Sequence, residues 1–237
     1  MFGKKADDNN NPSNNNDNFW VIQNLRFYTG QIPSAPDGDL IDVIHKTWWD
    51  NYELLEKHDG YIQWLFPTME QSSNSLAQPL QRAEADEIKA TPEAMDRFLK
   101  SYKMMLSFYG MKLSTEMLGV IEREDNWQGR FRHLNNSPRE YERITRILKS
   151  LGLLGFEFLK KPFIEFMIHE AMKTKELENV LPSCRDIWIH TLANTADQRV
   201  LLQTCELFPR MGEVADEASR TIWRWSAIKE WGKDKTS

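Results

Sequence analysis

Apolar side chains recur at steps of three or four residues over most of the chain, which is the spacing of one face of an α-helix. The clearest example lies between residues 40 and 57 and consists of Ile41, Ile44, Trp48, Tyr52 and Leu55. Nowhere do β-branched and polar residues alternate over a length that would predict a strand. The pattern therefore predicts an all-α fold, in the form of a single multi-helix globular bundle.

Prolines that follow Thr or Ser indicate where further helices begin. The pairs Thr91–Pro92 and Ser137–Pro138 each place an N-cap residue before a proline at the first helical position. The residues Ser137–Glu140 also have the sequence of a capping box, in which two side chains bond backbone N–H groups. We expect the first of these helices to end at Gly110 and the second at Gly152, because glycine readily takes the left-handed conformation that ends a helix.

Composition divides the chain into three parts. Residues 1–18 are rich in Asn and Asp and almost free of apolar side chains, so they cannot offset the entropy of ordering, and we predict a disordered tail. Residues 19–172 are predicted to form the main helical domain, and its first aromatic stretch, residues 19–32, is expected to be an extended or irregular arm. We expect residues 173–237 to be a helical extension packed on the same domain, with a terminal helix over 212–231.

The length, composition and net charge of the chain limit the class of protein to which it can belong. The chain has 237 residues, of which 41% are hydrophobic and 27% charged, and a formal net charge of −5, so no strongly charged partner is required. Its two cysteines, Cys184 and Cys205, are typical of a reducing compartment. No secretory signal begins the chain, and no apolar run approaches the ~18 to 20 residues of a membrane helix. We expect an intracellular protein, cytoplasmic or nuclear, that does not span a membrane.

Motifs for catalysis are missing from the sequence. It contains no GK[ST] phosphate loop, no GxSxG elbow and no HExxH metal motif. His58 beside Asp59 has the composition of a proton-transfer couple, but no nucleophile or cofactor motif accompanies it. Two pairs have the spacing of metal ligands on a helix, Asp42 with His45 and Glu165 with His169, yet each stands alone. We therefore expect no enzymatic activity, no cofactor and no metal.

Aromatic and acidic residues gather between His45 and Pro67 and form the first candidate site. The residues that we assign to a ligand there are Trp49, Asp50, Glu53, His58, Asp59, Tyr61 and Trp64. Trp49 points about 100° away from the apolar stripe, which places it toward solvent. The alternative for the rings is core packing, because aromatic residues at helical spacing usually fill the interior.

A basic stripe is the second candidate site. Arg139, Arg143 and Arg146 step by four and three along one face of a predicted helix. Arginine suits phosphate and carboxylate groups, so this stripe is a candidate for binding nucleic acid or an acidic partner helix. Glu140 and Glu142 dilute its charge, and a solvated helix face is the alternative. If the helix borders the aromatic cluster, the same arginines are placed to bind a peptide carboxylate.

Five blocks of sequence, in order, carry a family resemblance. They are NLRFYTG (24–30), DGYIQWLFP (59–67), FYGMKL (108–113), NWQGRFRHLN (126–135) and RITRILKSLG (143–152). Together they resemble the amino-terminal domain of the opioid growth factor receptor family, over roughly residues 20–172. The resemblance implies a peptide- or protein-binding domain with a role in growth regulation, and it implies methionine enkephalin as the ligand.

The implied ligand suggests roles for the candidate residues. Methionine enkephalin is a pentapeptide with an amino terminus, a Tyr, a Phe and a carboxylate. The resemblance therefore implies that an acid from the first site, Asp50, Glu53 or Asp59, meets the amine. Trp49, Tyr61 and Trp64 would supply aromatic walls, and Arg143 or Arg146 would supply the cation for the carboxylate.

Overall fold

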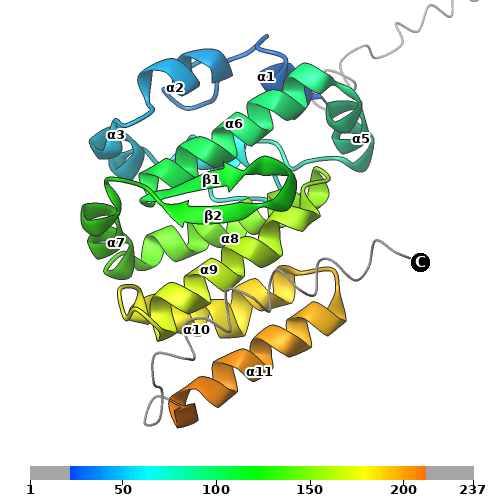
Figure 1. Ribbon diagram of the computed structural model, residues 1–237. Coiled ribbons are helices and arrows are strands. Elements are labelled where there is room, and N and C mark those ends of the chain that lie inside the picture. Colours follow the sequence, from blue (N-terminus) through cyan, green and yellow to red (C-terminus); the bar gives the residue numbers. More distant parts are fainter. Residues whose placement is uncertain (1–21, 212–237) are drawn as a thin grey trace, which may run out of the picture.

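The apolar stripes of the sequence become helices in the computed structural model, which describes residues 22–211 (Figure 1). The predicted disordered tail at residues 1–18 and the predicted terminal helix at 212–231 both lie outside these residues. The α-helices are α1 (Gln23–Tyr28), α2 (Ile41–Thr47), α3 (Tyr52–Lys57), α4 (Ile62–Leu65), α5 (Arg82–Ala90), α6 (Pro92–Phe108), α7 (Trp127–Asn135), α8 (Pro138–Leu153), α9 (Lys160–Met172), α10 (Leu181–Ser183) and α11 (Thr195–Met211). The prediction of a mostly helical bundle is confirmed.

Short turns of other helix types join these elements. Turns of 3₁₀ helix occupy Glu116–Leu118, Glu157–Leu159, Glu178–Val180 and Ile189–Thr191, and a π-helical segment occupies Cys184–Trp188. Within the described residues no helix is both long and apolar enough to cross a lipid bilayer.

One hairpin interrupts the helical pattern. Strands β1 (Met111–Thr115) and β2 (Val120–Arg123) pair antiparallel, with Met111 opposite Arg123, and lie against the helices in Figure 1. Gly119 takes a left-handed φ of 68° at the turn, where a Cβ atom would lie 3.2 Å from the Leu159 side chain. Each strand has at most five residues. Alternation over so short a length gives no detectable sequence signal, which is why no strand was predicted.

The helix starts agree with the sequence, whereas the caps and ends agree only in part. The predicted end of α6 is confirmed, because Gly110 follows the C-cap residue Tyr109 with a left-handed φ of 80°. Helix α6 begins at Pro92 and α8 at Pro138, as predicted. The Ser137 side chain makes no capping hydrogen bond, so the predicted capping box is wrong, and the proline alone marks the start. Helix α8 also continues past Gly152 to Leu153, and it is Gly155 that takes the left-handed conformation, with a φ of 85°.

The predicted irregular arm at residues 19–32 contains a helix instead. Helix α1 is held by a buried carboxylate of α5, since Glu84 accepts hydrogen bonds from Asn24 Nδ2 at 2.9 Å and from the Leu25 N–H at 3.1 Å. With six residues, α1 is too short to show a helical period in the sequence. Helix α1 is therefore stabilised by a tertiary contact to Glu84, which the local sequence pattern does not reveal.

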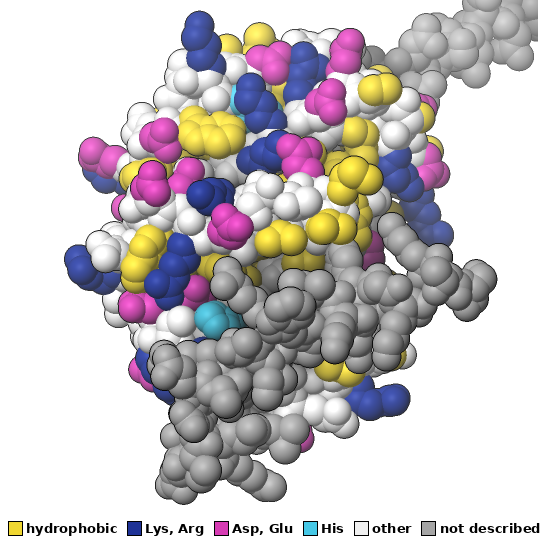
Figure 2. Space-filling model, viewed as in Figure 1, with side chains coloured by type: hydrophobic (Ala, Val, Ile, Leu, Met, Phe, Trp, Pro, Cys, Tyr) yellow, Lys and Arg dark blue, Asp and Glu magenta, His cyan; other side chains and the backbone are white. Residues whose placement is uncertain are grey.

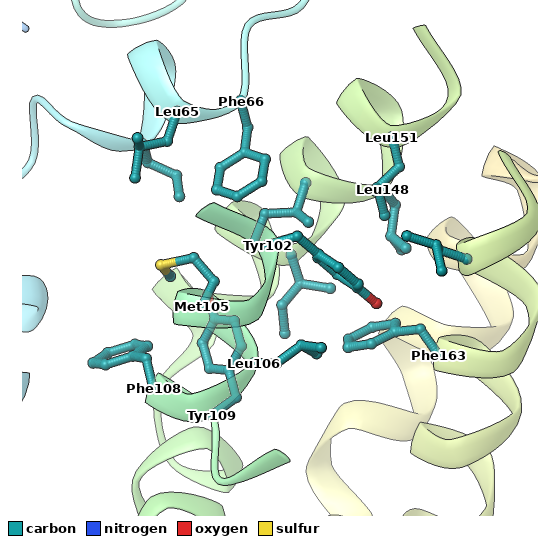
Figure 3. Packing of buried hydrophobic residues seen from close by; sticks show 14 of the residues in the cluster. Leu65, Phe66, Tyr102, Met105, Leu106, Phe108, Tyr109, Leu148, Leu151 and Phe163 are labelled. Atoms are coloured by element: carbon teal, nitrogen blue, oxygen red, sulfur yellow. The ribbon is translucent and has the colours of Figure 1, made fainter. Parts of the chain in front are cut away.

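The main core lies where α6, α8 and α9 meet. Figure 3 shows Tyr102 and Leu106 of α6 directed toward side chains of α8 and α9, among them Leu148, Leu151 and Phe163. Met105 points to the opposite side of α6, and Tyr109 belongs to the same buried cluster. All of these side chains are at most 3% exposed. Full burial of each such side chain is worth about 1.5 to 3 kcal/mol, so this interface holds the three long helices in fixed positions.

Residues after α9 pack back on the same helices. Trp188 is fully buried, and its Nε1 donates to Thr145 Oγ1 of α8 at 2.9 Å. Lys160 Nζ donates to the Thr191 carbonyl oxygen at 2.7 Å, and Lys161 Nζ pairs with Asp197 of α11 at 2.7 Å. Helices α8 and α9 are therefore covered on one side by the chain between residues 181 and 206.

Candidate functional site

The aromatic rings of the first candidate site divide between core and surface. Tyr61 is fully buried and donates its hydroxyl proton to the Leu55 carbonyl oxygen at 3.2 Å. Trp64 is 3% exposed, and its Nε1 donates to the Ala35 carbonyl oxygen at 2.8 Å. The two rings are therefore interior packing with satisfied polar atoms, and they are not available as ligand walls in this conformation. Trp49 is half-buried against the core.

The acids assigned to the ligand amine do not gather in one place. Asp50 is exposed with a φ of 63°, and it accepts a hydrogen bond from the Tyr52 hydroxyl at 3.2 Å. Glu53 is exposed and pairs with Lys57 at 2.6 Å. Asp59 pairs with Arg139 of α8. Of the three, Asp59 alone joins the basic stripe.

His58 and Asp59 do not form the proton-transfer couple suggested by their adjacency. His58 Nδ1 accepts a hydrogen bond from the Gly60 N–H at 3.0 Å, and the imidazole ring lies 5.0 Å from the Trp48 ring. The Asp59 carboxylate faces the guanidinium groups of Arg139 and Arg143 instead. In this arrangement the imidazole packs on the core and the carboxylate faces cations.

A groove forms between α8 and the chain from Asp59 to Ser73, and we call it the α8 groove. Its volume is about 470 Å³. Its cations are Arg139, Arg143, Arg146 and Lys149, and its acids are Asp59, Glu70 and Glu142. The structure thus brings Asp59, Arg143 and Arg146 together out of the residues assigned from sequence. An interior cavity beside Tyr102 has only about 10 Å³, which leaves room for no more than a water.

Arg143 is occupied by the fold. Its side chain is 5% exposed and donates to the carbonyl oxygens of Leu55 at 2.8 Å and His58 at 3.0 Å. It also pairs with Glu140 at 3.1 Å. Carbonyls at the end of a helix lack helical partners, so Arg143 closes the end of α3. Its guanidinium has little left to offer a ligand.

Two other cations of the groove carry exposed acidic partners. Arg139 pairs with Asp59, and the two side chains are 47% and 77% exposed. Lys149 Nζ pairs with Glu70 at 2.8 Å, and this pairing lowers the pKa of the Glu70 carboxyl. Exposed ion pairs are worth about 0 to 1 kcal/mol, so a ligand can separate either of them at small cost.

Arg146 differs from the other three cations. Its Nε donates to the Phe66 carbonyl oxygen at 2.8 Å, while its two terminal nitrogens make no hydrogen bond or ion pair with the residues that the structure describes. Burial lowers its pKa to about 10, an effect that nearby Glu70 only partly offsets. Exposed Glu142 lines the same groove but forms no ion pair with it. A half-buried guanidinium without a carboxylate is a ready partner for an anion.

The pairs with metal-ligand spacing serve other purposes. Asp42 is bound by Arg97 at 2.8 Å, and His45 is buried with its Nε2 2.8 Å from Ser101 Oγ. Burial raises the pKa of Glu165 and lowers that of His169, and both line a small hollow beside α11. Between residues 22 and 211 no three His, Cys, Asp or Glu side chains gather as a metal-binding group would.

Sequence reasoning missed half of the groove. Lys149 lies near the basic stripe in the sequence but was not assigned to the site, although it continues the stripe three residues beyond Arg146. Glu70, Ser72 and Ser73 come from the loop over residues 66–81, which has no periodic signal. Their position depends on contacts with residues distant in sequence, which local pattern does not encode.

Comparisons with known proteins give a consistent result. A family model described as the opioid growth factor receptor conserved region matches residues 17–214. Mouse opioid growth factor receptor-like protein 1 is 46% identical over 182 residues, which cover 77% of this chain and 39% of the relative. The Xenopus tropicalis protein of that name is 44% identical over 76% of this chain and 35% of its own length. Human opioid growth factor receptor is 39% identical over 76% of this chain and 26% of its own length.

The chain thus spans 39% or less of the length of the relatives that it matches. No solved structure matches the chain.

Proposed function

We propose that this chain, which belongs to the opioid growth factor receptor family, is a peptide- or protein-binding module whose ligand occupies the α8 groove. The observation that carries this proposal is the Arg146 guanidinium, which opens on a groove of about 470 Å³ with its terminal nitrogens unbonded to the described residues. Relatives with 39% identity are named receptors, which supports binding as the activity.

The proposed ligand class is a short peptide with a free carboxylate, of which methionine enkephalin is the specific candidate. The Arg146 fork can hold a carboxylate with two parallel hydrogen bonds. The acids Asp59 and Glu142 line the same groove and are the partners that we propose for the peptide amine. This assignment replaces Asp50 and Glu53, which do not line the groove.

Magnitudes set the affinity that we expect. Ordering a flexible pentapeptide costs roughly 5 to 10 kcal/mol in backbone entropy. Each charge-assisted hydrogen bond contributes about 1.5 to 3 kcal/mol. With Tyr61 and Trp64 in the core, the groove offers few rings to a ligand. We therefore expect a dissociation constant of micromolar order or weaker, because nanomolar binding needs about −12 kcal/mol net.

Calorimetric titration tests the proposal. Methionine enkephalin is titrated into the whole chain and into Arg146→Gln, with Arg132→Gln as the matched control because Arg132 is exposed on α7 and does not line the groove. We expect at least tenfold weaker binding for Arg146→Gln and an unchanged affinity for Arg132→Gln. Absence of heat with the wild-type chain would remove this ligand, and equal affinities for all three proteins would remove the groove.

The nucleic-acid alternative gains no support from the groove. Three carboxylates line it among the cations, and they would repel a phosphate backbone. The face drawn in Figure 2 likewise mixes basic and acidic side chains over its described surface. Action inside the cell, in growth regulation and without catalysis, completes the proposal. The support for a role in growth regulation is that relatives with 39% identity are named opioid growth factor receptors.

A further inference from the structure

We propose that Ser73 is a phosphorylation site whose phosphoryl group binds Arg146 and closes the α8 groove. The proposed function is needed only for one further consequence, that the closed groove no longer admits a peptide ligand. The modification itself and its contact with Arg146 stand independently of any peptide.

The loop that carries Ser73 is fixed at both ends of the groove. On one side both Glu70 carboxylate oxygens accept hydrogen bonds from Lys149 Nζ, at 2.9 and 2.8 Å. On the other side Asn74 Nδ2 donates to the carbonyl oxygens of Ala35 at 2.7 Å and Gly60 at 3.2 Å. Ser73 lies between these two contacts and lines the groove. An acidic group of this loop already reaches a cation of α8, since Glu70 does so.

Ser73 is the accessible hydroxyl of this stretch. It is exposed and makes no hydrogen bond with the described residues. The neighbouring Ser72 is half-buried, and its Oγ donates to the Asn74 carbonyl oxygen at 3.0 Å. The chain around both residues has no helix or strand that would keep it from a kinase. Exposure and the absence of helix or strand around it therefore favour Ser73 as the acceptor.

The transfer requires a protein kinase and a nucleoside triphosphate. The bond between Ser73 Oγ and the γ-phosphorus forms, and the bond from that phosphorus to the bridging oxygen breaks. The nucleoside diphosphate leaves, and the hydroxyl proton passes to the base of the kinase. The product places a charge of about −1.5 to −2 and three acceptor oxygens on the loop.

Arg146 is the cation that we expect to bind the phosphoryl group. Its two terminal nitrogens are unbonded to the described residues and open on the groove that Ser73 lines. Two of the three acids that line the groove, Asp59 and Glu70, are already paired with Arg139 and Lys149, which limits their repulsion. The third, Glu142, is exposed to solvent, which screens its charge. A planar guanidinium binds phosphate through two hydrogen bonds, and that contact would hold the loop across the groove.

Phosphorus NMR tests the contact directly. The full chain is made with phosphoserine installed at position 73 or, as a matched control, at position 75, which is exposed in the same loop but lines a different hollow. An unperturbed phosphoserine has a second pKa near 6. We expect the group at position 73 to titrate about one unit lower, because an opposite charge nearby favours the dianion. In Arg146→Gln its pKa should return to the value at position 75.

Two results would overturn the proposal. One is identical titration of the phosphates at positions 73 and 75, a comparison that needs no Arg146 variant and so decides even if that variant does not fold. The other is a lowered pKa that persists in folded Arg146→Gln. Calorimetry with methionine enkephalin adds the regulatory arm, where phosphate at position 73 should weaken binding at least tenfold and phosphate at position 75 should not. If no form binds the peptide, the proposed ligand fails while the phosphorus result still decides the contact between the phosphoryl group and Arg146.

Discussion

Burial lowers the pKa of His45, a residue that does not line the α8 groove. The side chain is 3% exposed and its Nε2 lies 2.8 Å from Ser101 Oγ. Since Ser101 gives its own proton to the Arg97 carbonyl oxygen, the imidazole must donate to Ser101. Burial, assisted by the positive charge of Lys100, lowers the pKa of His45 to about 4. The neutral ring is therefore the form that the folded protein holds.

The pH dependence of stability follows from that pKa. Between pH 6.5 and 4 the unfolded chain binds a proton at His45 that the folded chain refuses, so the free energy of unfolding falls as pH falls through this window. At about 1.36 kcal/mol per pKa unit the loss is about 3 kcal/mol. Urea denaturation from pH 7 to 4 measures it. His133 and His169 have lowered pKa values too, so part of the slope persists without His45.

Two variants separate the titration of His45 from its packing. His45→Gln keeps a donor for Ser101 but cannot titrate, so its stability should depend less steeply on pH. Ser101→Ala removes the hydrogen bond and keeps the imidazole, so it should lower stability at every pH and leave the slope in place. An unchanged slope in His45→Gln would contradict the assignment.

At the candidate site, the sequence predicted the positions of the charged residues better than those of the aromatic residues. The stripe of Arg139, Arg143 and Arg146 was visible because helical spacing puts those residues on one face. Tyr61 and Trp64 were ambiguous, since a ring at helical spacing is equally consistent with a wall or with a core. Only the structure shows that both terminal nitrogens of Arg143 bond backbone carbonyl oxygens, whereas Arg146 uses only its Nε in this way.

Helices α3 and α8 are joined by Arg143, and this connection is expected to carry much of their mutual stability. Arg143→Met leaves the Glu140 carboxylate buried without its cation and removes the hydrogen bond to the His58 carbonyl oxygen, while the Leu55 carbonyl oxygen keeps only the one from Tyr61. Breaking a buried ion pair costs about 3 to 5 kcal/mol. Urea denaturation at pH 7 should show a loss of that size.

Arg139→Met is the control for this prediction. It removes an arginine from the same helix face, but its side chain is 47% exposed and its partner Asp59 is 77% exposed. Its cost should stay below about 1 kcal/mol. Equal losses in the two variants would mean that Arg143 contributes no more than a surface charge.

Most elements with long apolar stripes were foreseen, and short ones were not. The exception is the stripe over residues 40–57, which the structure divides into α2 and α3, with Asp50 at a φ of 63° between them. Helices α6 and α8, with 17 and 16 residues, show both a stripe and a proline at the start. Helix α1 and the hairpin have too few residues for a period, and they are held by tertiary contacts. Arg123 of β2 illustrates this, because it pairs with Glu170 of α9 and lies 3.9 Å over the Trp127 ring.

At the scale of the molecule, the segment after α9 is expected to be part of the folding unit. Trp188 is fully buried, with ring contacts to Tyr141 and Phe163. Removing a buried Trp alone costs about 3 to 5 kcal/mol, a large share of the 5 to 15 that stabilise a domain. A chain ended after residue 172 should lose cooperative urea unfolding, whereas one ended after residue 211 should keep it. Matching unfolding curves for the two would refute this dependence.

The groove itself was beyond sequence reasoning, because it is a property of the whole arrangement. Its floor comes from α8 and its rim from the loop over residues 66–81. That loop reaches its place through Glu70 and Asn74, whose partners are 79, 39 and 14 residues away in the chain. Pairings over such distances leave no local period, so the fold class was accessible from one sequence and the hollow was not.

The burial of the block at residues 59–67 has an evolutionary consequence. Tyr61, Trp64 and Phe66 fill the interior, so a chain that inherits this block inherits an architecture. Under the proposed function, the choice of ligand is left to positions that the core does not use, chiefly residue 146 and its neighbours in the α8 groove. Two descendants of one ancestral scaffold can therefore keep the same signature and diverge completely in what they recognise.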